Sequence, residues 1–243
     1  MGVETVLLVG IVAFLTSALT AILGFGGGIV LLAVLVAFVD PLVAIPLHAA
    51  IQVVSNGTRT IVRRRDVDWS IVWRFSLLLL PAGALTLSIA RDAPAAALQV
   101  AIASGILTAT WLPHWFDRPL PPPRAAGWIG LGGVAGALNP VVGATGAMVA
   151  PFFRSATRDR LGFVGTFAAS QVAGHAAKLV LFGSLGLLPA SQAPAAVAGI
   201  VGVVVGTWLG SRILDRMPER RFERIYLVAI TAVAVWLVAD ALV

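Results

Sequence analysis

The sequence predicts an all-α polytopic membrane protein made of two inverted repeats. Three observations carry this prediction: the composition, a series of apolar runs of membrane-spanning length, and an internal duplication. Of the 243 residues, 59% are hydrophobic and only 12% are charged, and the mean hydropathy is +0.97. Soluble globular domains do not have such values. The length gives room for roughly eight to ten helical segments of about 20 residues each, so we expect one transmembrane domain over residues 1–243.

The apolar runs place the expected helices. They are residues 3–22, 26–39, 41–62, 70–90, 94–112, 125–138, 141–153, 160–183, 192–213 and 221–241. Two of them, 26–39 and 141–153, would rise only about 20 Å and cannot cross a bilayer alone. Each follows a break rich in Gly or Pro, "LGFGGG" at 23–28 and "NPVVGATG" at 139–146. We therefore expect a broken or re-entrant helix at both places.

Basic residues give the chain its expected orientation. Nearly all of them lie in or beside alternate loops, and one topology places all of these loops on the same side of the membrane. These basic residues are Arg63, Arg64, Arg65, Arg118, Arg124, Arg154, Arg158, Arg160, Arg212, Arg216, Arg220, Arg221 and Arg224. The positive-inside rule makes that side the cytoplasm and puts both termini outside a multi-pass protein of the cell inner membrane. The net charge of +6 then reflects topology, and no nucleic-acid partner is expected.

An internal duplication divides the chain. When Gly24 is set over Gly143, residues 24–59 align with 143–178 without a gap. "GFGG" lies over "GATG" and "AAIQV" over "AASQV", with Asp40 over Asp159. We expect halves of approximately 1–112 and 125–243, joined by a polar linker at 113–124. Each half would contain a Gly-rich broken or re-entrant helix plus about three full spans. That odd number of crossings makes the halves inverted, a design typical of secondary transporters.

The chain resembles the sulfite exporter TauE/SafE family. "LGFGGGIVLLAVLV" and "AIPLHAAIQVVSNGTRTIVRRRDVDW" are similar to the first half of that family. "GGVAGALNPVVGATGAMVAPFF" and "TFAASQVAGHAAKLVLFG" are similar to the second half. The resemblance covers nearly the whole chain. It implies a membrane transporter that exports sulfite, an organosulfonate or a similar small anion.

A polar stripe in each half marks the candidate substrate site. Gln52, Asn56 and Arg59 follow one another at steps of four and three, and so share one helix face. Gln171, His175 and Lys178 repeat the pattern. Glycines at the start of the short helices would let an anion approach backbone N–H groups at the positive end of the helix dipole. The predicted substrate-binding residues are Gly24, Gly26, Gly27, Gly28, Gln52, Asn56, Arg59, Gly143, Thr145, Gly146, Gln171, His175 and Lys178.

Structural roles remain as alternatives for these residues. Arg59 and Lys178 lie near helix ends and could extend to the interface. The glutamines could join helices, and the glycines could serve close packing. His48, near the outer end of its span, has no histidine partner in the other half. The GxxxG pattern of Gly202, Gly206 and Gly210 favours packing within the chain over a homodimer interface.

The remaining chemistry points to transport without catalysis. The chain has no cysteine, and its one lysine is not in a phosphate-binding loop. We expect no enzyme activity, metal or cofactor, and a small anion and the lipid bilayer as partners. No Asp or Glu lies in the middle of a run, so a proton-linked flux would depend on another group, of which His175 is the best candidate. These observations favour a secondary transporter working by alternating access, with a passive anion channel as the alternative.

Overall fold

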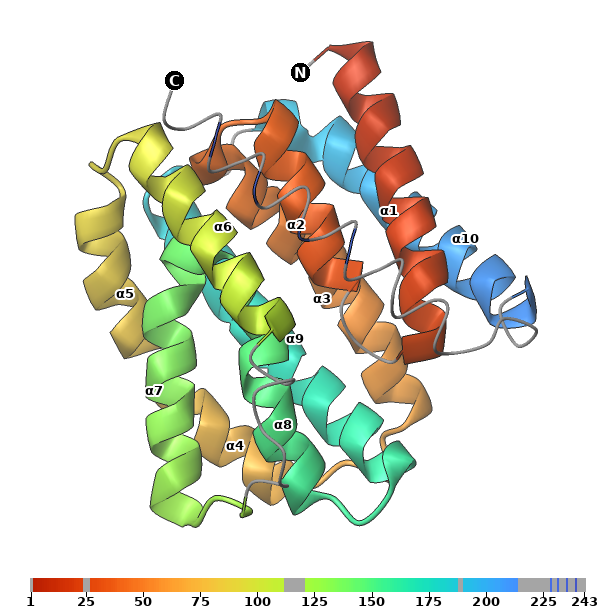
Figure 1. Ribbon diagram of the computed structural model, residues 1–243, viewed down its shortest axis with the longest axis vertical. Coiled ribbons are helices and arrows are strands. Elements are labelled where there is room, and N and C mark those ends of the chain that lie inside the picture. Colours follow the sequence, from red (N-terminus) through yellow and green to blue (C-terminus); the bar gives the residue numbers. More distant parts are fainter. Residues whose placement is uncertain are drawn as a thin grey trace.

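The computed structural model describes residues 2–23, 27–111, 121–187 and 190–213, together with residues 228, 231, 235 and 239. In these parts of the chain every regular element is a helix (Figure 1). The helices are α1 (Val3–Leu23), α2 (Gly27–Phe38), α3 (Pro41–Val62), α4 (Trp69–Ser76), α5 (Leu79–Ala90), α6 (Ala95–Trp111), α7 (Ala125–Val142), α8 (Gly146–Ala156), α9 (Arg160–Ser184), the short 3-10 helix η2 (Ala190–Gln192) and α10 (Ala193–Ile213). Most of the last predicted run, 221–241, and the linker up to residue 120 lie outside the described residues.

Most helix bounds follow the apolar runs, but one predicted helix is interrupted. The run 70–90 is not continuous, because it divides into α4 and α5 at Leu77 and Leu78. The glycine face of α7 lies against this junction. A Cβ atom on Gly132 would stand 1.8 Å from the carbonyl oxygen of Phe75, and one on Gly136 would stand 2.6 Å from that of Leu79. The two backbones therefore approach more closely than side chains would allow.

The second break lies slightly later than its sequence pattern suggests. Helix α7 continues through Pro140 to Val142, and the interruption falls between Gly143 and Thr145. Gly143 has a φ of 74°, a conformation that favours glycine and that ends helices. The proline is thus accommodated inside the helix, and the glycine terminates it.

Helices α3 and α9 pack against each other in the middle of the molecule (Figure 1). Both begin at an aspartate whose side chain caps the helix. Oδ1 of Asp40 accepts a hydrogen bond from the Leu42 N–H at 2.8 Å, and Oδ1 of Asp159 accepts one from the Gly162 N–H at 2.8 Å. An N-terminal carboxylate of this kind satisfies backbone donors that have no partner within the helix. The two aspartates, aligned in the duplication, therefore start the two central helices in the same way.

The outer helices pack in pairs that are distant in the sequence. Helix α1 lies along α10, while α7 lies along α4 and α5. The contact of α1 with α10 is close, because a Cβ atom on Gly202 would stand 2.3 Å from the carbonyl oxygen of Gly10. Oγ of Ser17 donates to the carbonyl oxygen of Val203 at 3.0 Å across the same contact. Gly202 and Gly206 therefore pack within the chain.

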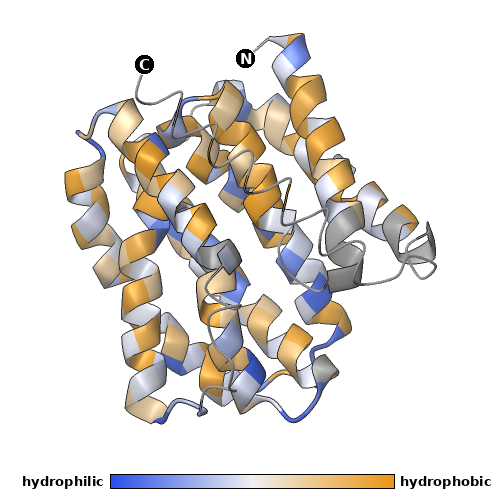
Figure 2. Cartoon of the chain, viewed as in Figure 1, coloured by the Kyte–Doolittle hydropathy of each residue, from blue (hydrophilic) through white to orange (hydrophobic). Residues whose placement is uncertain are grey.

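Apolar residues dominate the helices (Figure 2), and many large apolar side chains are exposed on the outside. Leu85 is 69% exposed and Ile89 is 72% exposed, and Val201 and Trp208 are also exposed. Such large apolar faces are unusual on a soluble monomer and suit contact with lipid. Three described stretches are long and apolar enough by themselves to cross a membrane: Trp69–Ala90, Ala125–Val142 and Ala190–Leu209. The fold is thus an all-helical membrane protein.

Candidate functional site

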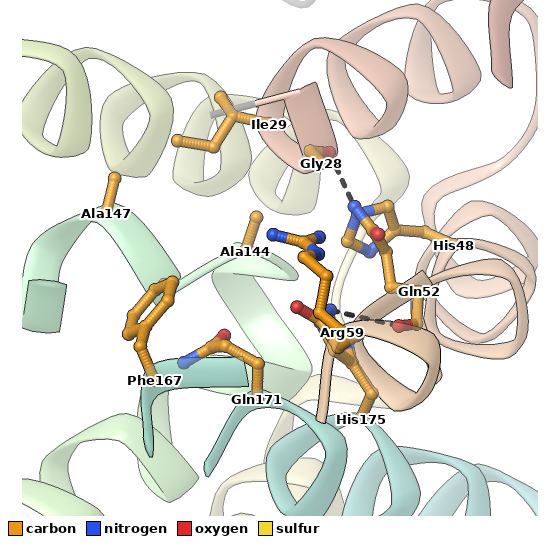
Figure 3. A pocket seen from close by; sticks show the side chains of 12 residues that line it. Gly28, Ile29, His48, Gln52, Arg59, Ala144, Ala147, Phe167, Gln171 and His175 are labelled. Carbon is orange, nitrogen blue, oxygen red and sulfur yellow. Dashed lines mark hydrogen bonds between the residues drawn. The ribbon is translucent and has the colours of Figure 1, made fainter. Parts of the chain in front are cut away.

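A cavity of about 50 Å³ lies where α3 and α9 meet the first turns of the two short helices, α2 and α8 (Figure 3). It is lined by Gly28, Ile29, His48, Gln52, Asn56, Arg59, Ala144, Gly146, Ala147, Phe167, Gln171 and His175. A water molecule needs about 10–15 Å³ on this scale, so the cavity has room for a molecule of a few heavy atoms.

Helix α3 supplies one polar wall. His48, Gln52, Asn56 and Arg59 follow one another at helical spacing and all line the cavity. The first three are buried, and Nδ2 of Asn56 donates a hydrogen bond to the carbonyl oxygen of Gln52 at 2.9 Å. The guanidinium group of Arg59 contacts Ser55 on its own helix, with 3.2 Å between Nη2 and Oγ. In Figure 3 the Arg59 side chain extends into the cavity rather than away from it.

Helix α9 supplies the facing wall through Phe167, Gln171 and His175. The imidazole ring of His175 meets that of His48 edge to face, with 5.4 Å between the ring centroids. Both histidines are more than nine-tenths buried, at 1% exposure for His48 and 7% for His175. The two helices therefore bring the two described histidines of the chain together at the cavity.

Each glutamine lies against the start of a short helix. A Cβ atom on Gly28 would stand 2.0 Å from Nε2 of Gln52, and one on Gly146 would stand 2.9 Å from Oε1 of Gln171. Glycine is thus required at both positions for the side-chain amide to lie where it does. The first turns of α2 and α8 also bring backbone N–H groups that lack partners within their helices. The cavity wall therefore combines side-chain amides with the positive ends of two helix dipoles.

The two aligned cations have different surroundings. Arg59 lines the cavity, whereas Lys178 is 1% exposed and is not among the lining residues. Nζ of Lys178 donates a hydrogen bond to the carbonyl oxygen of Gly143 at the end of α7. Lys178 thus does not extend to the membrane interface, and its ammonium group binds the backbone at the break between α7 and α8.

The predicted site residues divide into three groups. Those that line the cavity are Gly28, Gln52, Asn56, Arg59, Gly146, Gln171 and His175. Those that are buried but do not line the cavity are Gly27, Gly143, Thr145 and Lys178, of which Thr145 donates from Oγ1 to Oδ1 of Asn139 at 3.0 Å. Gly24 and Gly26 lie outside the described residues.

Several lining residues were not among the predicted site residues. His48 and Phe167 each precede a predicted glutamine by one helical turn, and the internal alignment sets one over the other. The sequence therefore contained a signal for these two residues. On each central helix, the face that carries the predicted glutamine continues for one turn before it. Ile29, Ala144 and Ala147 also line the cavity, but apolar residues beside the glycine breaks carry no distinguishing pattern.

Comparison with known families gives a match over almost the whole chain. A family model described as "Sulfite exporter TauE/SafE" matches residues 9–237. No curated protein and no solved structure matches the chain significantly.

Proposed function

Because the chain belongs to the sulfite exporter TauE/SafE family, a family of membrane transporters, we propose that it is a secondary transporter of a small oxyanion. The substrate is sulfite, an organosulfonate or a similar anion, and it leaves the cytoplasm by alternating access. The observation that carries this proposal is the cavity in which a glutamine and a short-helix start from each half of the sequence lie together.

The chemistry of the cavity wall suits an anion. Arg59 offers a positive charge and fixed N–H donors, and Gln52 and Gln171 can each donate from an amide. No Asp or Glu is among the described residues that line the cavity. An anion buried without such donors would pay a large desolvation cost. The size of the cavity favours a compact oxyanion with few heavy atoms over a long-chain sulfonate.

The packing of the helices supports two inverted halves, 1–112 and 125–243. Asp40 and Asp159 cap the central helices alike. Gln52 lies against Gly28 as Gln171 lies against Gly146. The crosswise pairing of α1 with α10 and of α7 with α4 and α5 is what a two-fold relation would produce, since α1 and α7 each begin a half. In this proposal the arginine-rich loops face the cytoplasm and both termini face outward.

Alternating access follows from this arrangement. The site lies between the halves, so a rocking motion of one half against the other would open it first to one side and then to the other. The short helices α2 and α8 would stay with the anion, because their first turns form part of its cavity.

Counterflow in proteoliposomes tests the proposal. Vesicles holding purified protein are preloaded with unlabelled sulfite and diluted into a trace of radiolabelled sulfite. A carrier exchanges the two and accumulates label transiently above equilibrium, with an initial rate that saturates. A passive anion channel shows neither overshoot nor saturation, and that result would replace the carrier with a channel. Vesicles carrying the Gln52→Ala/Gln171→Ala protein are the control, and they should accumulate little label.

A further inference from the structure

Among the described residues at the cavity, His48 and His175 form a pair of titratable side chains that anion binding alone does not explain. Nε2 of His48 lies 2.8 Å from the carbonyl oxygen of Gly28. A carbonyl oxygen only accepts, so this nitrogen carries a hydrogen and donates it (Figure 3). The ring of His48 is thereby fixed between the start of α2 and the ring of His175.

Each ring keeps one buried nitrogen without a partner. Nδ1 of His48 and Nδ1 of His175 are both inaccessible to solvent and form no hydrogen bond in the described part of the chain. Leaving a buried polar atom unsatisfied is costly, and native proteins rarely do so without a reason. On His48, where Nε2 already holds a hydrogen, Nδ1 is the atom able to accept a proton.

In the described part of the chain, the charged groups that act on the pair are cations. Lys178 on α9 and Arg59 on α3 are the basic residues whose charges act on His175, and Lys178 also acts on His48. Helices α2, α5, α6 and α7 contain no ionisable side chain, and those of α4 and α8 lie at helix ends, at Arg74 and Arg154. The acidic residues of the described chain lie in loops or at helix ends: Glu4, Asp40, Asp66, Asp68, Asp92 and Asp159.

An added positive charge on either imidazole is therefore opposed while the cavity holds no anion. A bound oxyanion reverses this, because it brings negative charge into a cavity that His48 and His175 both line. We propose that the anion and a proton bind this site together, and that the His48–His175 pair holds the proton. This inference rests on the proposed transport function and names its coupling ion.

The sign of the effect follows from linkage. If anion binding takes up a proton, lower pH must strengthen anion binding by the same coupling. Affinity for an anion of fixed charge should therefore rise as pH falls through the neutral range, by at most about tenfold per pH unit for one proton. A site that uses only Arg59 and amide donors would show no such dependence, since those groups do not titrate there.

The duplication suggests substitutions that the fold should accept. The residue aligned with His48 is Phe167, and the residue aligned with His175 is Asn56. His48→Phe and His175→Asn therefore each introduce the side chain that already occupies the aligned position in the duplication. His114→Asn removes the third histidine, which is outside the described residues, and serves as the matched control.

Proton uptake is measured by titrating sulfite, and separately thiosulfate, into purified protein by calorimetry in two buffers of different ionisation enthalpy. Thiosulfate does not titrate near neutral pH, and with sulfite the contribution of the ligand itself is the same for every protein. We expect the wild-type and His114→Asn proteins to take up close to one proton per bound anion at the pH where uptake is greatest. The double variant His48→Phe/His175→Asn should still bind the anion, but proton uptake should fall by most of one proton per bound anion. Its affinity for thiosulfate should no longer depend on pH.

Two outcomes would overturn the inference. One is anion binding by the wild-type protein without proton uptake between about pH 6 and 8.5. The other is equal uptake by the wild-type protein and the double variant. Thermal shift checks that the double variant is folded; if it is not, His175→Asn alone must lower or displace the uptake. Absence of any anion binding by the wild-type protein would instead remove the proposed function itself.

Discussion

Lys178 on α9 donates a hydrogen bond from Nζ to the carbonyl oxygen of Gly143, the residue at which α7 ends. The ammonium group is buried with the backbone turn that it binds. The duplication aligns Lys178 with Arg59, but only Arg59 lines the cavity. One of the two aligned basic residues thus supports the backbone at the break, and the other lines the cavity.

Replacing Lys178 with Met should therefore lower stability as well as anion affinity. The methionine keeps the apolar stem but leaves the Gly143 carbonyl without its donor, which costs about 1.5–3 kcal/mol for a hydrogen bond to a charged group. We expect a lower melting temperature in thermal shift, with a smaller loss for Lys178→Arg. A Lys178→Met protein that melts like the wild type would show that this hydrogen bond does not stabilise the break.

Arg59 should act on binding more than on stability. Arg59→Met removes the charge that lines the cavity, whereas Arg59→Lys keeps a charge but loses the planar fork of donors. We expect sulfite affinity to fall by about a hundredfold or more in the first protein and by roughly tenfold in the second. Calorimetry measures both, and similar affinities for all three proteins would place the guanidinium group outside the anion site.

The two glutamines test the amide donors directly. Gln52→Ala and Gln171→Ala should each weaken anion binding by about ten- to a hundredfold, because a hydrogen bond to an anion is worth roughly 1.5–3 kcal/mol. Expression in the membrane should stay at the wild-type level. Normal binding and transport by both variants would assign the glutamines to helix contacts and remove them from the site.

A methyl group added to either glycine at the start of α2 or α8 should displace a glutamine side chain. Gly28→Ala and Gly146→Ala would each push the neighbouring glutamine from its place, so we expect losses in sulfite affinity like those of the glutamine variants. Gly57→Ala is the matched control on α3, since its Cβ would meet no atom within 4 Å. That control should bind normally and gain a little stability, about 0.5–1 kcal/mol. Equal binding by Gly28→Ala and Gly57→Ala would contradict the tight contact.

The glycines of α10 should matter for folding and not for association. A Cβ atom on Gly206 would stand 2.2 Å from the carbonyl oxygen of Phe14, and one on Gly202 would be nearly as close to Gly10. Gly202→Ala and Gly206→Ala should each cost about 1–3 kcal/mol through overpacking and lower the melting temperature, with no change in mass measured by light scattering. Gly130→Ala, which meets nothing within 4 Å, is the control. A change of mass at unchanged melting temperature would indicate a homodimer interface instead.

The helices were predictable where residue type alone decides their bounds. Asp40 followed by Pro41 starts α3 at the expected residue, because a capping side chain and a fixed φ both favour a helix start there. The division between α4 and α5 was not predictable, since Leu77 and Leu78 lie in a continuous apolar run. It occurs where the glycines of α7 bring a second backbone against that run, and such a contact has no local sequence signal.

The candidate site was also predictable only in part. Helical spacing placed Gln52 and Gln171 on cavity-facing stripes, and the duplication indicated that the stripes belong together. Spacing does not tell which atom the end of a long side chain will reach. Lys178 and Arg59 therefore looked equivalent in sequence and differ in the fold. No polar residue repeats at the position of His48, because its aligned residue is Phe167, yet both residues line the cavity, one from α3 and the other from α9.

The pairing of α1 with α10 has a consequence for biosynthesis. Helix α1 is synthesised well before α10, the helix that covers its Gly10 and Ser17. Until α10 has been inserted, that face of α1 must remain in lipid or be held by an insertion factor. A chain truncated before residue 193 would never acquire the partner, so α1 would present a polar, close-packing surface to the quality-control proteases of the membrane.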